Sequence, residues 1–277
     1  MSGECGSKIY RQVAFQSSSL VVGWSRDAGK LGPKVTDYLN RQLDAQELAE
    51  IEPSDFFPLG GVSVEDDVAQ FPESKFYCCQ ERNLVIFKGD PPRAEWYKFL
   101  NSVLDIAEQC CHVAELYTIG GMVSFSAHTA PRELFAVANS PEVKKILTRY
   151  DIVTGMDYET APGQRPTISS FLLWVAKRRN IAGASLWVPI PFYLVAIEDP
   201  EAWRKSLEFL DTRFGLGIDF TELDEDISRQ REKIARARIH SPEVDDYIRK
   251  LESNISLTRE ESEKLVAEIE GFLTKRE

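Results

Sequence analysis

The chain has 277 residues, of which 43% are hydrophobic and 28% are charged, and its formal net charge is −11. That apolar fraction is enough to offset the chain entropy lost on folding, which excludes a wholly disordered chain. Phosphate backbones and anionic lipid surfaces repel such a charge, and no basic stripe reverses it, so we expect neither nucleic acid nor membrane as a partner.

No targeting or membrane segment stands out in the sequence. Residues 1–18 are polar and lack the basic-then-apolar pattern of a signal peptide. The longest apolar stretch, residues 184–197, is shorter than the roughly 20 residues that span a bilayer. Pro189 and Pro191 also interrupt it. We therefore expect an unanchored cytoplasmic protein.

The cysteines do not form the framework of a secreted protein. Their number is odd and four of them are adjacent in pairs: Cys5, Cys78, Cys79, Cys110 and Cys111. This pattern predicts free thiols that are buried or half-buried. The only Cys/His cluster is residues 110–112, and no second cluster completes a metal site. We expect neither a metal nor a cofactor.

Short apolar runs predict strands along the first three quarters of the chain. In order they are residues 20–22, 76–79, 84–87, 113–119, 134–138 and 186–188. Continuous apolar runs are typical of strands that are covered on both faces, as in a parallel sheet. The run at 76–79 is expected to pair beside the run at 84–87.

Helices are predicted between these strands. Four of them share a start in which Asp or Ser accepts a free N–H and Pro fills the first turn: Asp90-Pro91, Ser140-Pro141, Asp199-Pro200 and Ser241-Pro242. Apolar stripes at helical spacing follow two of these starts: Trp96, Leu100, Val103 and Ala107, and then Trp203, Leu207, Leu210 and Phe214. Further helices are expected over residues 34–43 and from about Thr167.

This alternation predicts a three-layer α/β/α sandwich with a mostly parallel central sheet over residues 1–217. Residues 218–277 are predicted to form an acidic helical appendage, because apolar residues become sparse and charges dense. Thr258 and Glu261 form a capping box there. Its stripes could pack on the main domain or form an interface with another subunit, and the candidate interface residues are Val244, Ile248, Leu251, Leu265, Ile269 and Phe272.

The turn at residues 23–31, GWSRDAGKL, is similar to a phosphate loop but is not one. Five residues separate Gly23 from Gly29 where the motif has four, and Leu31 stands where a hydroxyl would bind magnesium. We interpret it as a strand-to-helix turn at the carboxyl end of a strand, where α/β proteins bind ligands. Asp27 either caps the following helix, which we favour, or is functional.

Other polar or conformationally special residues follow predicted strands, and with Asp27 they form a candidate ligand-binding set: Gly120, Gly121, His128, Tyr158 and Tyr193. We expect these side chains to converge at the carboxyl edge of the sheet. A catalytic His128 would need an orienting carboxylate and a nucleophile, and the sequence identifies neither. We interpret His128 as a loop histidine with structural hydrogen bonds, and we predict no catalytic residue.

Four stretches together resemble the proteasome assembly chaperone two family, in its bacterial and archaeal branch. They are residues 20–32 (LVVGWSRDAGKLG), 120–132 (GGMVSFSAHTAPR), 185–202 (SLWVPIPFYLVAIEDPEA), and 218–226 followed by 242–252 (PEVDDYIRKLE). The chain departs from the family at residues 130–132, where Ala-Pro-Arg replaces Arg-Pro. It also ends Thr274-Lys275-Arg276-Glu277, without the hydrophobic-Tyr-x tail that some archaeal members dock on the proteasome.

The resemblance implies an α/β/α sandwich similar to nucleoside phosphorylases, self-association, and no established enzymatic activity. We therefore predict a non-catalytic, protein-binding homo-oligomer, with another protein as a second partner. The alternative is an enzyme or binder of a small polar, nucleoside-like ligand at the carboxyl edge of the sheet. That alternative rests on analogy between folds.

Overall fold

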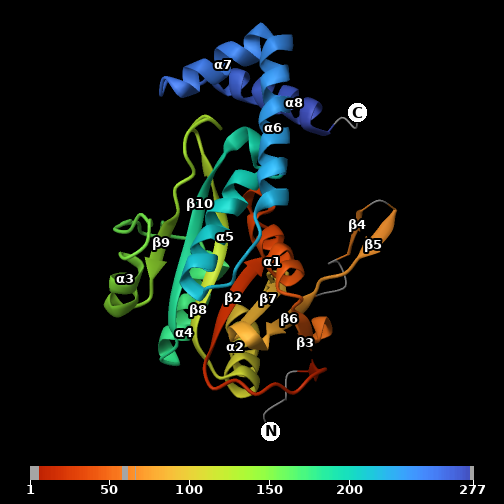
Figure 1. The fold of residues 1–277 in the computed structure, drawn as a ribbon, viewed down its shortest axis with the longest axis vertical. Helices are drawn as coiled ribbons and strands as arrows, with labels where there is room; N and C mark the ends of the chain where they lie inside the picture. The colour runs from red at the N-terminus through yellow and green to blue at the C-terminus, as the bar shows by residue number, and fades with distance from the viewer. Residues whose placement is uncertain (1–5, 58–61, 66, 275–277) are drawn as a thin grey trace.

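A computed structural model describes residues 6–57, 62–65 and 67–274, so Cys5 and the tail at 275–277 lie outside the described residues. An eight-stranded sheet forms the centre of the molecule (Figure 1). Its strands in spatial order are β1 (Ser7–Ile9), β3 (Gln46–Ile51), β6 (Ser74–Cys79), β7 (Leu84–Gly89), β2 (Ser18–Trp24), β8 (Val113–Ser124), β10 (Ala182–Pro191) and β9 (Phe135–Ala138). Strands β4 (Ser63–Glu65) and β5 (Val68–Gln70) form a separate hairpin that projects from the body.

The predicted α/β class is confirmed, and the parallel part of the sheet is confined to its centre. β7, β2, β8 and β10 pair in parallel, whereas the strands on both flanks pair antiparallel. Every predicted strand is present, and β6 pairs with β7 as expected. The sequence reading missed β3, QELAEI, because its charged residues hide the buried positions Leu48, Ala49 and Ile51.

Helices cover both faces of the sheet and bury a separate hydrophobic cluster under each. α1 (Leu31–Gln42) and α5 (Pro200–Phe214) contribute to one cluster, with Leu39 and Leu207 fully buried. α2 (Trp96–Cys111) and α4 (Ile168–Arg178) contribute to the other, with Leu100 and Leu172 fully buried. The short helix α3 (Pro141–Leu147) contacts the edge strand β9. Apolar stripes at helical spacing thus dock on both sides of one sheet.

Three of the four predicted helix starts are present, and the predicted start at Asp90 is wrong. Ser140, Asp199 and Ser241 each accept a backbone N–H in the helix that follows. Asp90 does not, because α2 begins only at Trp96. Pro91 precedes Pro92, and a proline disfavours helical geometry in the residue before it. Asp90 instead accepts the N–H of Glu73 at 3.0 Å.

The C-terminal residues form three helices, α6 (Thr221–His240), α7 (Pro242–Glu252) and α8 (Arg259–Thr274). Their apolar stripes pack within the chain, which is one of the two alternatives left open by the sequence. Val244, Ile248, Leu251, Leu265 and Ile269 are at most 5% exposed, and Phe272 packs partly buried against the same cluster. The candidate interface residues are therefore covered by the chain itself.

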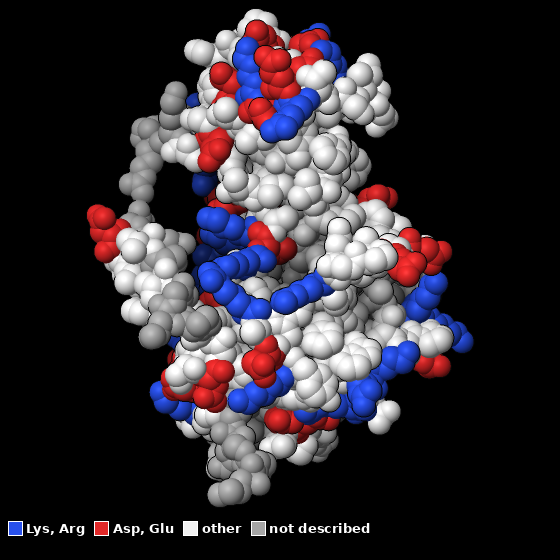
Figure 2. Space-filling model, turned by 180° about the vertical axis from the view of Figure 1, so that it is seen from behind, with Lys and Arg blue, Asp and Glu red and all other residues white. Residues whose placement is uncertain are grey.

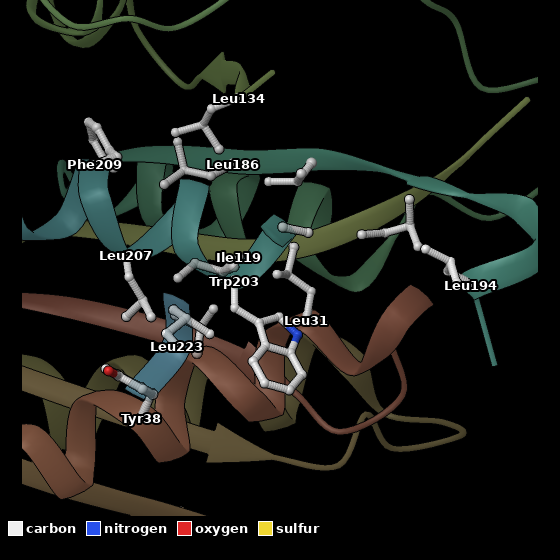
Figure 3. Close-up of a cluster of buried hydrophobic side chains, with 14 of the residues drawn as sticks. Leu31, Tyr38, Ile119, Leu134, Leu186, Leu194, Trp203, Leu207, Phe209 and Leu223 are labelled. Carbon is white, nitrogen blue, oxygen red and sulfur yellow. The ribbon is translucent and has the colours of Figure 1, made fainter. Parts of the chain in front are cut away.

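The C-terminal helices share the hydrophobic cluster of α1 and α5. Figure 3 shows Leu223 of α6 beside Tyr38 of α1 and close to Leu207 and Trp203 of α5. Helix α8 contacts the turn η4 (Phe192–Leu194), which follows β10. Residues 218–274 contain no strand in the structure, and their division from residues 1–217 as a separate domain stays a prediction.

Two further properties concern the surface and the membrane. Figure 2 shows Lys and Arg side chains gathered at mid-height on the back of the molecule, although the chain carries a net charge of −11. The negative charge is therefore unevenly spread, which the linear sequence does not show. Among the described helices, none combines the length and the apolar character that crossing a bilayer requires.

Candidate functional site

Asp27 connects two parts of the carboxyl edge of the sheet. Its Oδ1 and Oδ2 atoms accept the N–H of Gly121 in β8 at 2.8 and 3.0 Å, and Oδ2 also accepts the N–H of Gly32 at 2.9 Å. Gly32 lies in the first turn of α1, so Asp27 caps that helix, as the favoured interpretation of the sequence predicted. Burial raises the pKa of Asp27 to about 6, against the opposing effect of these backbone donors.

The edge between β2 and β8 is the topological switch point of the parallel strands. The chain leaves β2 for β7 on one side and later returns to β8 on the other. Ligands of open α/β sheets bind in the crevice at such a point. In this chain the turn η1 (Ala28–Lys30) fills that place, because a Cβ on Gly121 would lie only 2.2 Å from the carbonyl oxygen of Ala28.

The same turn is also held from the far side of the crevice. The N–H of Gly29 donates to the carbonyl of Val195 at 2.9 Å, just after η4. A Cβ on Gly29 would lie 3.1 Å from Ile190 Cγ2, and the φ angle of Gly29 is +64°. Close approach and backbone conformation both require glycine here. The chain's own backbone therefore occupies the crevice where a ligand would be expected.

His128 and Tyr193 form a second contact at this edge. The Tyr193 hydroxyl accepts the backbone N–H of His128 at 2.6 Å and lies 2.9 Å from its Nδ1. Burial, followed by the nearby Arg132 charge, lowers the pKa of His128 to about 4. The ring is thus neutral at physiological pH, and Nδ1 can accept the tyrosine proton. Burial also raises the pKa of Tyr193, so its hydroxyl keeps its proton at neutral pH.

Arg132 and Asp199 form a buried ion pair close to the contact between His128 and Tyr193. Arg132 Nε lies 3.0 Å from Asp199 Oδ2, and the two side chains are 4% and 0% exposed. Arg132 Nη1 also donates to the carbonyls of His128 and Ala130. Asp199 in turn caps α5 through the N–H of Ala202. The ion pair therefore links the loop at residues 128–132 to the first turn of α5.

The structure brings together only part of the predicted ligand-binding set. Asp27 contacts Gly121, His128 contacts Tyr193, and Gly120 faces the Trp187 ring of β10. Tyr158 lies elsewhere: it is 62% exposed, with its hydroxyl 3.2 Å from Ser170 Oγ. Ser170 belongs to α4, which packs on the opposite face of the sheet. A ligand-binding role for the set stays a prediction.

An aromatic surface on α2 and α4 was not singled out from the sequence. We call the group Trp96, Tyr97, Phe171 and Trp174 the aromatic face. Phe171 and Trp174 stack with ring centroids 5.2 Å apart, and Tyr97 lies 5.9 Å from Trp174. Tyr97 is 50% exposed and Trp174 is 44% exposed. The spacing of Phe171 and Trp174, three residues apart on a helix, is the signal that could have revealed it.

The sequence comparison with protein families matches residues 20–238 to the PAC2 family. The chain belongs to the PAC2 family. The match covers nearly all of the parallel part of the sheet, the turn at Asp27 and most of α6, and it confirms the resemblance noted in the sequence. Comparison of this PAC2 chain with curated proteins gave no match.

Solved structures share the fold of this PAC2 protein at low sequence identity. A Mycobacterium tuberculosis protein of unknown function superposes with a TM-score of 0.77 at 19% identity, covering 92% of this chain and 90% of its own. A proteasome-assembly chaperone homologue from the same organism gives 0.68 at 16%, covering 83% and 99%. PbaB, an archaeal proteasome activator from Pyrococcus furiosus, gives 0.68 at 20%, covering 84% and 98%. These likenesses establish the fold.

Sequence reasoning also missed the part that Arg132 and Asp199 play in this PAC2 protein. In the sequence, Asp199 was recognised only as a helix cap, and Arg132 only as part of a departure from the family pattern. No local pattern predicts their pairing, because 67 residues separate them. For metals, the described ranges hold no group of three or more His, Cys, Asp or Glu side chains that could bind an ion.

Proposed function

We propose that this PAC2 protein works by binding proteins, first a second copy of itself, and that it catalyses no reaction. The observation that carries the proposal is the aromatic face. Tyr97 and Trp174 lie next to each other at the surface with about half of each side chain exposed to water. Contiguous exposed apolar groups mark interaction surfaces in proteins that are otherwise soluble.

The aromatic face is also held in a fixed arrangement. Phe171 stacks on Trp174 with an interplanar angle of 8°, and the Arg178 guanidinium lies 5.2 Å from the Trp174 ring centroid. Rigid aromatic side chains lose little conformational entropy on binding, and they are enriched at the centres of interfaces. A two-fold contact would place this face against its own counterpart, which is the commonest arrangement of homo-oligomers.

Two other observations support binding over catalysis. The crevice at the switch point is filled by the turn that contains Gly29, so the place where α/β enzymes hold substrate is closed. Solved structures with this fold include a proteasome-assembly chaperone homologue and a proteasome activator. By analogy, we propose a chaperone-like role in which the self-associated protein contacts a second protein.

Light scattering on the purified protein over a range of concentrations tests the first step. We expect a homo-oligomer whose dissociation constant rises at least about tenfold in Trp174→Lys and Tyr97→Lys, as expected for residues at the centre of an interface. The matched control is Ile239→Lys, because Ile239 on α6 is 83% exposed and lies away from the aromatic face. A strictly monomeric wild type, or variants that associate as the wild type does, would refute the proposal.

A further inference from the structure

A cavity of about 350 Å³ lies beside the filled crevice, between the turn η1, the start of α5, α6 and the end of α8. Its apolar walls include Ile197, Trp203 and Leu273. It is separate from the aromatic face, which lies on the opposite side of the sheet. Binding sites for small molecules combine such apolar walls with a few convergent polar groups.

The charged groups of this cavity leave an excess of positive charge. Its acidic side chains are already paired: Asp226 lies 2.9 Å from Arg229, and Glu198 lies 2.5 Å from Lys34. Lys30 and Lys233 also line the cavity, and neither ammonium group has a partner among the described residues. Two unpaired cations therefore face one cavity in a chain with a net charge of −11.

Trp203 gives the cavity an aromatic wall. Its side chain forms one wall of the cavity and is 7% exposed, and its indole Nε1–H has no hydrogen-bond partner in the described part of the chain. Figure 3 shows the indole nitrogen on the side of the ring that faces Leu31, the residue after Lys30. An unpaired buried donor is rare in folded proteins, and because this nitrogen is closed to the surface the indole reports on changes at this wall without bonding the carboxylate.

We propose that this cavity binds a monoanion that carries an apolar group, namely a carboxylate attached to a hydrocarbon chain or to an apolar amino acid. The carboxylate lies between Lys30 and Lys233, and the apolar part lies against Trp203 and Ile197. A phosphate fits less well, because the carboxylates of Asp226 and Glu198 repel a second negative charge. The Arg229 guanidinium is also paired with Asp226 and is not free to bind a phosphate. The proposal does not depend on self-association.

Calorimetric titration with sodium octanoate and with N-acetyl-leucine tests this assignment. We expect saturable binding of both, and binding of the uncharged N-acetyl-leucinamide at least about tenfold weaker, as for the loss of a charge-assisted hydrogen bond. Lys30→Ala and Lys233→Ala should each weaken octanoate binding about tenfold. Lys177→Ala, an exposed lysine on α4, is the matched control and should bind as the wild type does.

The indole resonance of Trp203 in a ¹⁵N-correlated NMR spectrum gives a second measurement, with Trp203→Phe to assign it. We expect that resonance to move on adding octanoate, in proportion to saturation. Hexapeptides that end in leucine, as free acid or amide, distinguish a protein C-terminus from a free carboxylic acid as the natural source. Equal binding of acid and amide, unchanged binding in both lysine variants, or displacement of octanoate by equimolar inorganic phosphate would overturn the proposal.

Discussion

Both carboxylate oxygens of Asp27 lie within 3.0 Å of the backbone nitrogen of Gly121, and this contact joins the turn after β2 to the neighbouring strand β8. It places backbone at the switch point of the sheet, where related architectures hold a ligand. At the carboxyl edge of the sheet in this PAC2 protein, the turn after β2 is therefore packed directly against β8. The open cavity lies beside it, under the C-terminal helices.

The first prediction concerns the pH dependence of the Asp27 contact. The folded-state pKa of about 6 exceeds the ordinary value of 3.8, so the folded chain holds this proton more tightly than the unfolded chain. The contribution of this proton to the free energy of unfolding is complete below pH 4. Up to about 3 kcal/mol of it is lost as the pH rises through 6. Relative to Asp27→Asn, the wild type should lose stability from pH 4 to 7 in urea unfolding. A difference that stays constant with pH would contradict this.

His128 should show the opposite dependence. Its folded-state pKa of about 4 lies below the ordinary value of 6.5, so the unfolded chain binds this proton more tightly. The contribution of the neutral ring to the free energy of unfolding is complete above pH 6.5. Up to about 3 kcal/mol of it is lost as the pH falls through 4. Relative to His128→Asn, the wild type should lose stability on acidification from pH 7 to 4. NMR titration of the ring should find it neutral at pH 6, and a protonated ring there would exclude this account.

Gly121→Ala should destabilise the fold severely. The added Cβ would lie 2.2 Å from the carbonyl oxygen of Ala28, so the backbone of the turn must move. We expect a loss of at least about 3 kcal/mol in the free energy of unfolding, in the range of severe steric changes. Gly271→Ala is the control, since nothing lies within 4 Å and the residue is inside α8. Thermal unfolding should show that control to be up to about 1 kcal/mol more stable.

Arg132→Met should leave Asp199 charged and buried without its partner. Breaking a buried pair on one side costs about 3–5 kcal/mol, so we expect a loss of that order. Lys205→Met is the matched control, because its partner Asp151 is 95% exposed and exposed pairs contribute little to stability. Equal losses in the free energy of unfolding for the two variants would show that the buried pair contributes no more to stability than the exposed pair.

A chain that ends at residue 217 tests how far the C-terminal helices form a separate unit. Leu223, Ile234 and Leu265 belong to the same hydrophobic cluster as α1 and α5, so their removal exposes apolar surface. We expect the shortened chain to melt at a lower temperature and to bind a hydrophobic dye such as ANS. Limited proteolysis of the full chain should cut slowly near residue 217. Rapid cutting there, with a stable 1–217 fragment, would instead show two independent domains.

The sequence by itself determined the local elements of this protein. Apolar runs such as residues 84–87 and stripes such as Trp203, Leu207 and Leu210 carry their periodicity within a few residues. The caps at Ser140 and Asp199 are equally local, so the α/β class followed from them, whereas the family followed from the four stretches that resemble it. The strand β3 was missed because Glu47 precedes and Glu50 interrupts its short run of buried residues.

Only the tertiary structure decided which distant residues meet. Asp27 bonds Gly121 across 94 positions, and Arg132 bonds Asp199 across 67. Tyr158, in contrast, lies on the face away from His128. Periodicity shows that a helix has an apolar side but not what covers it, so the stripe at Val244, Ile248 and Leu251 predicted an interface as readily as a core. Packing against the rest of the chain resolves that ambiguity, because burial depends on neighbours that sequence spacing does not encode.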